Sequence, residues 1–146
     1  MKDCWIFDMD GTLSNADHRR KWVMHKPKNW PAWNAGMAYD PPHMDIVQFT
    51  NIADERGISV IICSGREEVY RDVTEGWLRK HNVPFVKAYM RKKGDYRDDS
   101  IIKKELLADI RVDGYNPLLA FDDRDRVVKA WRECGIRCLQ VAEGNF

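Results

Sequence analysis

Short apolar runs alternate with longer amphipathic stretches along most of the chain. The clearest run, residues 58–63, is rich in β-branched side chains and alternates little with polar ones, which is typical of a strand covered on both faces. Four more runs of this kind occur at residues 4–7, 85–89, 118–121 and 137–141. Strands separated by helical stretches predict an α/β fold with a doubly wound, parallel, five-stranded, Rossmann-like sheet.

The stretches between these runs have the spacing and the ends that are typical of helices. We expect helices over residues 44–55, 67–81, 99–110 and 125–134. Residues that commonly end helices follow them, namely Gly57, Asn82, Gly114 and Gly135.

Residues 15–43 interrupt this rhythm. They hold Trp22, Trp30 and Trp33, half of the chain's six tryptophans, together with four prolines and a cluster of basic residues. The segment is far longer than a strand-to-helix turn, which usually takes about 2 to 6 residues. We therefore expect a small helical cap, inserted after the first strand of a single domain that spans residues 1–146.

Charge and hydropathy exclude several classes of function. The 146 residues contain 24 lysines and arginines and 23 acidic residues, a net charge of +1, so no bulk field draws the protein to nucleic acid or to a membrane. No apolar run approaches the roughly 20 residues of a spanning helix, and the first residues do not have the pattern of a signal peptide. These features favour a cytoplasmic protein without a membrane partner.

The four cysteines give no sign of a metal or redox site. Cys4, Cys63, Cys134 and Cys138 include no CxxC pair, and the first two lie inside apolar runs, where cysteine behaves as a small hydrophobic residue. We expect reduced thiols.

Acidic pairs follow two of the predicted strands. Asp8 and Asp10 come after the first run and precede Gly11, and the pair Asp122 and Asp123 ends the fourth. Open α/β sheets bind ligands at the carboxyl ends of their strands. Carboxylates brought together repel one another unless a cation lies between them, so the two pairs predict a divalent metal with oxygen ligands, most simply Mg²⁺.

Groups suited to phosphate oxygens accompany these acids. Ser64, Gly65 and Arg66 follow the second predicted strand and offer a hydroxyl, a flexible backbone amide and a guanidinium. Lys103, near the start of the predicted helix 99–110, supplies a further positive charge. A carboxylate nucleophile, a metal, a lysine and a hydroxyl together are suited to phosphoryl transfer.

The order of these motifs resembles that of the haloacid dehalogenase superfamily of phosphatases. The motifs are the run from Asp8 to Leu13, Ser64, Lys103 and the Asp122–Asp123 pair. More narrowly, residues 91–99, 122–132 and 140–146 resemble the 3′-phosphatase domain of the phage polynucleotide kinase/phosphatase.

This resemblance implies a covalent mechanism. Asp8 would attack phosphorus to form an aspartyl-phosphate, and Asp10 would protonate the leaving oxygen and then activate water, exchanging a proton near neutral pH. Ser64 and Lys103 would hold the phosphoryl oxygens. Mg²⁺ would be bound by Asp8, Asp10 through its backbone carbonyl, and one or both of Asp122 and Asp123. The resemblance also implies substrate-binding roles for Thr12, Arg19, Gly65, Arg66 and Asp99, the last as an acid that orients the lysine or the metal shell.

The substrate is less constrained than the chemistry. The chain has no GxxxxGK[ST] phosphate loop, so the kinase half of the phage enzyme is absent, and residues 18–34 differ from the corresponding part of that enzyme. We expect a Mg²⁺-dependent phosphatase that removes the 3′-phosphate of polynucleotide ends, with a separate kinase or ligase in the same pathway. A nucleotidase acting on free nucleoside monophosphates and a non-catalytic module that binds nucleic-acid ends are the alternatives.

Two features leave both a functional and a structural interpretation open. Trp22, Trp30 and Trp33, interleaved with basic residues, are suited to stacking on bases, but a small cap also needs bulky residues for its own core. The run 91–93 is either a solvated basic turn or a phosphate-facing one. His18, His25 and His43 lack metal spacing, and we assign them no catalytic task.

Overall fold

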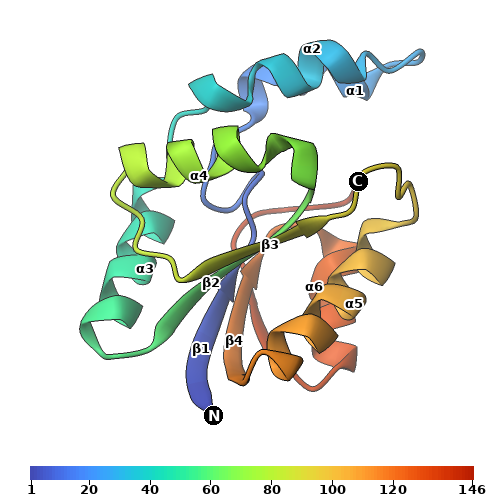
Figure 1. The fold of residues 1–146 in the computed structure, drawn as a ribbon. Coiled ribbons are helices and arrows are strands. Elements are labelled where there is room, and N and C mark those ends of the chain that lie inside the picture. Colours follow the sequence, from blue (N-terminus) through green and yellow to red (C-terminus); the bar gives the residue numbers. More distant parts are fainter.

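The computed structural model describes all residues, 1–146, and contains one parallel sheet with the strand order β3-β2-β1-β4-β5 (Figure 1). The strands are β1 (Lys2–Phe7), β2 (Ser59–Glu67), β3 (Lys87–Arg91), β4 (Tyr115–Asp122) and β5 (Arg137–Gln140). The predicted α/β fold with five parallel strands is confirmed.

Helices cover both faces of the sheet, and each face has its own apolar core. On one face, α3 (Met44–Glu55) and α4 (Arg71–Lys80) pack with Val47 and Leu78 against Phe7, Val60 and Ile62. On the other face lie α5 (Asp99–Val112) and α6 (Asp125–Glu133), whose buried side chains include Leu107 and Trp131. Because side chains alternate along a strand, the apolar run of β2 supplies both cores, as expected for a central strand.

Three predicted boundaries on the β2 side of the sheet were wrong. β2 continues to Glu67, so Ser64, Gly65 and Arg66 lie within its irregular last part rather than after it, where the pairing register with β3 shifts. The predicted helix 67–81 therefore starts only at Arg71, after a 3-10 turn. The third strand begins two residues later than its apolar run suggested, because residues 85 and 86 form the partly exposed approach to it.

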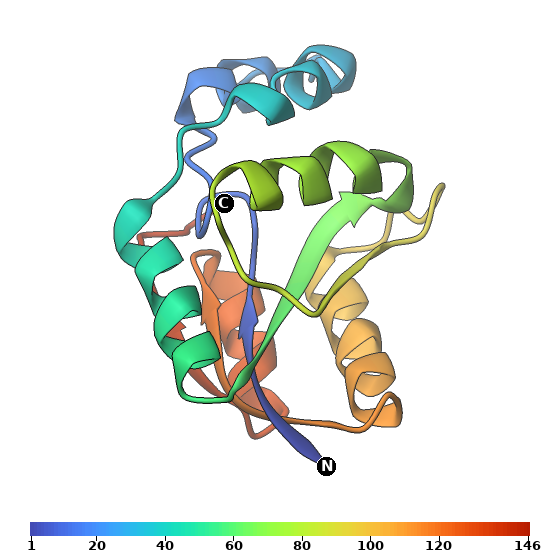
Figure 2. The same cartoon turned by 60° about the vertical axis from the view of Figure 1, so that its left-hand side comes forward.

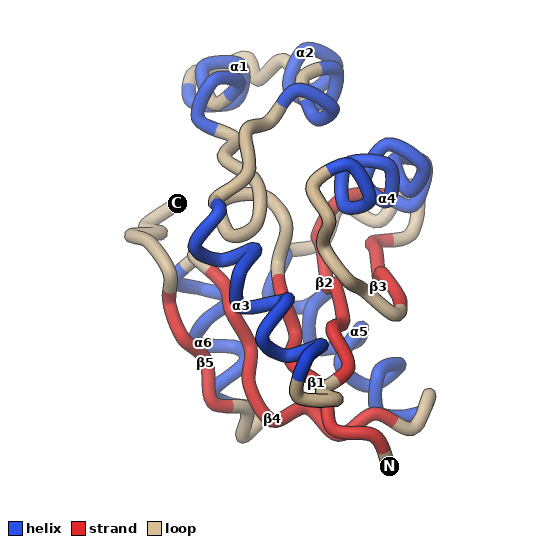
Figure 3. The backbone as a smooth tube through the Cα atoms, turned by 90° about the vertical axis from the view of Figure 1, so that its left-hand side faces the viewer, coloured by secondary structure: helices blue, strands red, loops and turns tan.

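The 15–43 segment forms short helices that stand beyond the end of the sheet where β1 terminates (Figures 2 and 3). They are a 3-10 turn (Asp17–Arg19), α1 (Lys21–Met24), α2 (Trp30–Ala35) and a second 3-10 turn (Met37–Tyr39). The segment lies above α4 and is thereby placed next to the edge at which ligands of open α/β sheets bind.

None of the helices combines the length and the apolar character needed to cross a membrane.

Candidate active site

Three of the predicted acids meet at the carboxyl end of the sheet. Asp8 directly follows β1, Asp122 ends β4, and Asp123 is the next residue. Since β1 and β4 are hydrogen-bonded neighbours with Phe7 opposite Phe121, the topology brings both acidic pairs to one point. Carboxylate oxygens of Asp8, Asp122 and Asp123, here called the acidic cluster, lie within 4.8 Å of one another, and all three residues are buried.

Lys103 of α5 is the only side-chain cation that contacts the acidic cluster. Its fully buried ammonium group donates to Asp8 Oδ1 at 2.9 Å and to Asp122 Oδ2 at 3.2 Å. Burial alone would lower the pKa of Lys103, but the charges of Asp122 and Asp8 outweigh it and raise that pKa above its usual value. Lys103 is therefore a fixed positive charge beside Asp8.

Asp122 has no free hydrogen-bonding capacity. Its Oδ1 accepts the backbone N–H groups of Asp123 at 2.9 Å and Arg124 at 3.3 Å. Its Oδ2 accepts Lys103 and the indole N–H of Trp131, both at 3.2 Å. Asp122 thus holds Lys103 and the turn after β4 in place, whereas Asp8 and Asp123 have fewer donors.

Asp8 and Asp123 share one hydroxyl donor, since Thr12 Oγ1 lies 3.4 Å from an oxygen of each. Burial, reinforced by the charge of Asp122, raises the pKa of Asp8 well above its usual range and that of Asp123 to about 6. Three carboxylates with a single lysine among them carry excess negative charge. This all-oxygen donor set fits a divalent cation.

Two glycines make room for the acids. Gly11 has a φ of +85°, and a Cβ there would overlap the carboxylate of Asp123. A Cβ on Gly65 would overlap the carboxylate of Asp99. The side chain of Asp99 contacts Arg91 at 3.2 Å and Arg124 at 3.9 Å, so its ion-pair partners are arginines rather than Lys103.

Ser64 is buried near the end of β2, and its hydroxyl accepts the backbone N–H of Arg66 at 3.1 Å. The Ser64 hydroxyl donates no hydrogen bond to another group of the domain. The residue is therefore held in position by the strand while it keeps a hydrogen-bond donor to offer.

Asp10 lies apart from the acidic cluster and binds two arginines. Arg66 donates Nε to Oδ2 at 3.1 Å and Nη2 to Oδ1 at 2.7 Å, and Arg19 Nη2 donates to Oδ1 at 2.5 Å. Burial would raise the pKa of Asp10, but Arg66 and Arg19 outweigh it and hold that pKa below its usual range. Asp10 is ionised in this arrangement, whereas the resemblance implies a residue that exchanges a proton near neutral pH.

The family model for the phosphatase domain of polynucleotide kinase matches residues 2–146. The chain belongs to this family. It is therefore a phosphatase domain, and the predicted membership of the haloacid dehalogenase superfamily is confirmed.

Individual relatives agree with this assignment. A chain in the structure of the Pnkp1/Rnl/Hen1 RNA repair complex is 34% identical with a TM-score of 0.84, and the match covers all of the phosphatase domain and 44% of that chain. A proposed bifunctional polynucleotide kinase/RNA ligase of Autographa californica nuclear polyhedrosis virus is 24% identical over 90% of the domain. The match spans only 18% of the viral protein. A class C acid phosphatase from Bacillus anthracis shares the fold. It is 15% identical with a TM-score of 0.73, and the match covers 99% of the domain and 68% of that chain.

One buried acid of the phosphatase domain was missed by the sequence analysis. Asp40 is 2% exposed and binds Arg19 through both carboxylate oxygens, at 2.8 Å from Nε and 2.6 Å from Nη2. His18 Nε2 lies 2.7 Å from Asp40 Oδ1, and the indole of Trp77 donates to the Asp40 carbonyl at 2.8 Å. A signal for this residue does exist, because Asp40 is the first acid after a run of 22 residues that contains none.

The basic and aromatic residues considered as substrate contacts differ in whether they face the interior of the domain or the solvent. The Cζ atom of Arg19 lies 4.2 Å from the centroid of the Trp33 ring, so Trp33 belongs to the inner side of the 15–43 segment. Trp22 and Trp30 are 39% and 52% exposed. Arg91 donates to the Gly65 carbonyl at 2.8 Å and to two carbonyls of the loop that precedes α5, so it organises that loop.

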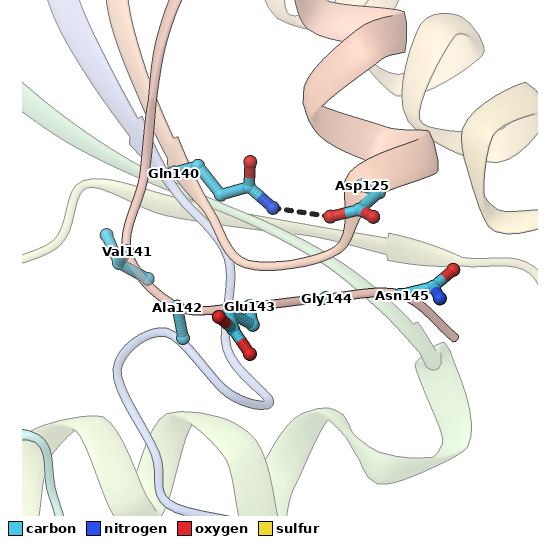
Figure 4. A pocket seen from close by; sticks show the side chains of 7 residues that line it. All are labelled: Asp125, Gln140, Val141, Ala142, Glu143, Gly144 and Asn145. Carbon is cyan, nitrogen blue, oxygen red and sulfur yellow. Dashed lines mark hydrogen bonds between the residues drawn. The ribbon is translucent and has the colours of Figure 1, made fainter.

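The C-terminal segment braces the loop that carries Asp123. Residues 140–145 line a hollow beside α6, where the Gln140 amide donates to the Asp125 carboxylate at 2.6 Å (Figure 4). The same amide reaches the Asp123 carbonyl at 3.0 Å, and Asp125 N–H donates to the Gly144 carbonyl at 2.9 Å. A Cβ on Gly144 would overlap the backbone of Asp123, so this close packing requires glycine.

Proposed function

We propose that this phosphatase domain removes the 3′-phosphate from polynucleotide ends through an aspartyl-phosphate intermediate, with Asp8 as the nucleophile and Mg²⁺ as the cofactor. The observation that carries the proposal is the meeting of Asp8 with Lys103, Thr12 and the paired acids after β4. The buried site supplies a carboxylate, a cation and a hydroxyl donor within one small volume.

Asp8 is suited to nucleophilic attack by its place in the chain. It is the first residue after β1, and it is 8% exposed while Lys103 behind it is fully buried. One carboxylate oxygen is oriented by Lys103 and the other by Thr12. In the first step an oxygen of Asp8 forms a bond to phosphorus as the bond to the ester oxygen breaks. In the second step water attacks the aspartyl-phosphate, and phosphate leaves with regeneration of the Asp8 carboxylate.

We assign the proton transfers of both steps to Asp10. As an ionised carboxylate it accepts the proton of the attacking water. Donating a proton to the leaving oxygen requires the neutral acid, and this form becomes accessible when the guanidiniums of Arg66 and Arg19 turn from Asp10 to the phosphate of the substrate. Arginine binds phosphate with the same bidentate geometry that Arg66 uses on Asp10.

The acidic cluster is the proposed metal site. Asp8 and Asp123 have lone pairs to offer, Asp122 supports them, and the backbone carbonyl of Asp10 is the further ligand that the resemblance suggests. The bound cation would neutralise the carboxylates and stabilise charge on the phosphoryl oxygens. We assign Mg²⁺ because every donor is a hard oxygen.

The proposed substrate follows from the family. The relatives named above include a polynucleotide kinase/RNA ligase and a component of an RNA repair complex. A 3′-phosphate blocks the hydroxyl that a ligase needs, so we propose that the domain acts alongside a kinase or ligase activity on the same nucleic-acid end.

Phosphate release from a matched panel tests the proposal. The panel contains a 3′-phosphorylated oligonucleotide, its 5′-phosphorylated counterpart, and 3′- and 5′-mononucleotides, each assayed with and without Mg²⁺. We expect Mg²⁺-dependent release with the highest kcat/KM on the 3′-phosphorylated oligonucleotide. Preference for a mononucleotide would indicate a nucleotidase, and binding without release from any substrate would indicate a non-catalytic module.

The Asp8→Asn variant tests the nucleophile with an almost isosteric side chain. Because a neutral amide does not attack phosphorus, we expect turnover to fall to background while the thermal unfolding midpoint stays close to that of the wild type. Asp17→Asn is the matched control, since this exposed carboxylate outside the site loses the same charge. A near-wild-type rate for Asp8→Asn would refute the assignment.

A further inference from the structure

The near-zero net charge of the chain conceals a strongly polarised distribution. Residues 18–39 contain five of the 24 lysines and arginines and none of the 23 acidic residues. The rest of the chain therefore has 19 basic and 23 acidic residues, a net charge of −4, whereas this stretch alone has a net charge of +5. The absence of bulk charge thus hides one local cationic surface.

Most of this positive charge is at the surface and unpaired. Arg19 is buried between Asp10 and Asp40, and Arg20 pairs with Asp17 at 3.0 Å. Lys21, Lys26 and Lys28 are exposed and form no ion pair. Three neighbouring ammonium groups without acidic partners are available to bind an anionic ligand.

Two exposed tryptophans lie among these lysines. Trp22 is on α1 and Trp30 begins α2, and Asn29 N–H donates to the Trp22 carbonyl at 2.6 Å, which ties the two helices together. Lys21 Nζ lies 5.0 Å from the ring centroid of Trp22, and Lys28 Nζ lies 5.4 Å from that of Trp30. Each of the two exposed indole rings therefore has an ammonium group beside it.

The inner and outer sides of this segment differ in chemistry. On the inner side, Arg19 stacks on Trp33 and donates to Asp10, so the segment is joined directly to the active site. The outer side, formed by residues 21–30 and called here the tryptophan–lysine face, forms no ion pair with the rest of the domain. Figure 3 shows α1 and α2 side by side, outward from the end of the sheet.

We infer that the tryptophan–lysine face binds single-stranded nucleic acid. Bases stack on Trp22 and Trp30, and backbone phosphates contact Lys21, Lys26 and Lys28. Aromatic platforms beside cations are what binding of a single strand requires, whereas an apolar protein partner would not call for three unpaired lysines without a single acid. The inference rests on the proposed function, because the bound strand is the one whose terminal 3′-phosphate enters the site next to Arg19.

Binding of a fluorescein-labelled single-stranded 12-mer with a 3′-hydroxyl, followed by fluorescence anisotropy, tests the inference without turnover. The Trp22→Leu/Trp30→Leu variant keeps apolar bulk but removes both ring faces. We expect its Kd to rise at least about tenfold, since stacking on an aromatic side chain contributes substantially for each base. An unchanged Kd overturns the inference and would favour a protein as the partner of this face.

The charge contribution is tested separately through salt dependence. Replacing Lys21, Lys26 and Lys28 with glutamine should reduce the slope of log Kd against log salt concentration by about 2, because each phosphate contact to a single strand contributes roughly 0.7. Replacing Lys2, Lys80 and Lys129, which are exposed elsewhere, removes the same charge and should leave the slope within about 0.5 of the wild type. Equal effects of the two triple variants would contradict a local binding face.

Turnover separates failure of this inference from failure of the proposed function. We expect the tryptophan variant to raise KM for a 3′-phosphorylated 12-mer about tenfold and KM for a 3′-mononucleotide less than twofold. If the wild type hydrolyses the 12-mer and the variant has the same KM for it, only the inferred binding face is overturned. If the wild type binds the 12-mer through the two tryptophans but releases no phosphate, the binding face is supported and the proposed function is overturned.

Discussion

Replacing Asp40 with asparagine tests whether one buried carboxylate holds the arginine that reaches Asp10. Asp40 accepts two short hydrogen bonds from Arg19 with both side chains almost fully buried, and Arg66 Nη2 lies 3.6 Å from its Oδ2. Removing one partner of a buried ion pair costs about 3 to 5 kcal/mol. Arg19 keeps Asp10 as a partner, so we expect the lower end of that range, a loss of about 3 kcal/mol in the free energy of unfolding.

Urea unfolding measures this loss, and we expect a lower midpoint with an unchanged m-value. The thermal midpoint should fall by roughly 10 °C for a domain of this size. Asp17→Asn is the control, because Asp17 pairs with Arg20 from a 76% exposed side chain and should change stability by less than about 0.5 kcal/mol.

The same variant should lower kcat/KM for a small phosphomonoester by about tenfold, because Arg19 loses the carboxylate that orients it toward Asp10. The reasoning is refuted if Asp40→Asn unfolds within about 0.5 kcal/mol of the wild type and keeps its full activity.

Three further predictions concern single positions. Gly11→Ala should lose more than about 2 kcal/mol of stability in urea unfolding, because alanine is strained at a φ of +85° and its Cβ overlaps Asp123. Lys103→Met leaves Asp8 and the rest of the acidic cluster without a cation. Its thermal midpoint should therefore fall in the absence of Mg²⁺ and recover in part when Mg²⁺ is added, and a midpoint that Mg²⁺ does not move would contradict this. Burial raises the pKa of Cys4, Cys63 and Cys138 to about 12, which keeps these thiols protonated at pH 8. A disulfide-exchange reagent should therefore titrate only Cys134 in the native protein, and a second reactive equivalent would refute this.

The fold and the core of the site could be predicted from the sequence because both depend on local patterns. Apolar runs at regular intervals indicate strands of a parallel sheet, and parallel strands all end at the same edge. Asp8 and the Asp122–Asp123 pair therefore had to meet once their strands were neighbours. Lys103 contacts Asp8 and Asp122 because α5 packs across the same region of the sheet.

Other features were decided only by the tertiary structure, because they depend on which groups meet through space. Arg66 is 56 positions from Asp10, yet it sets the ionisation of that carboxylate together with Arg19. Asp40 has no motif around it, and its importance comes from complete burial against Arg19. The sequence does not distinguish Trp22 from Trp33. In the structure Arg19 packs on the ring of Trp33, which faces inward, whereas Trp22 is exposed to solvent. A local pattern determines which residue types are present, whereas burial and the distances between remote side chains determine their charge state and their partners.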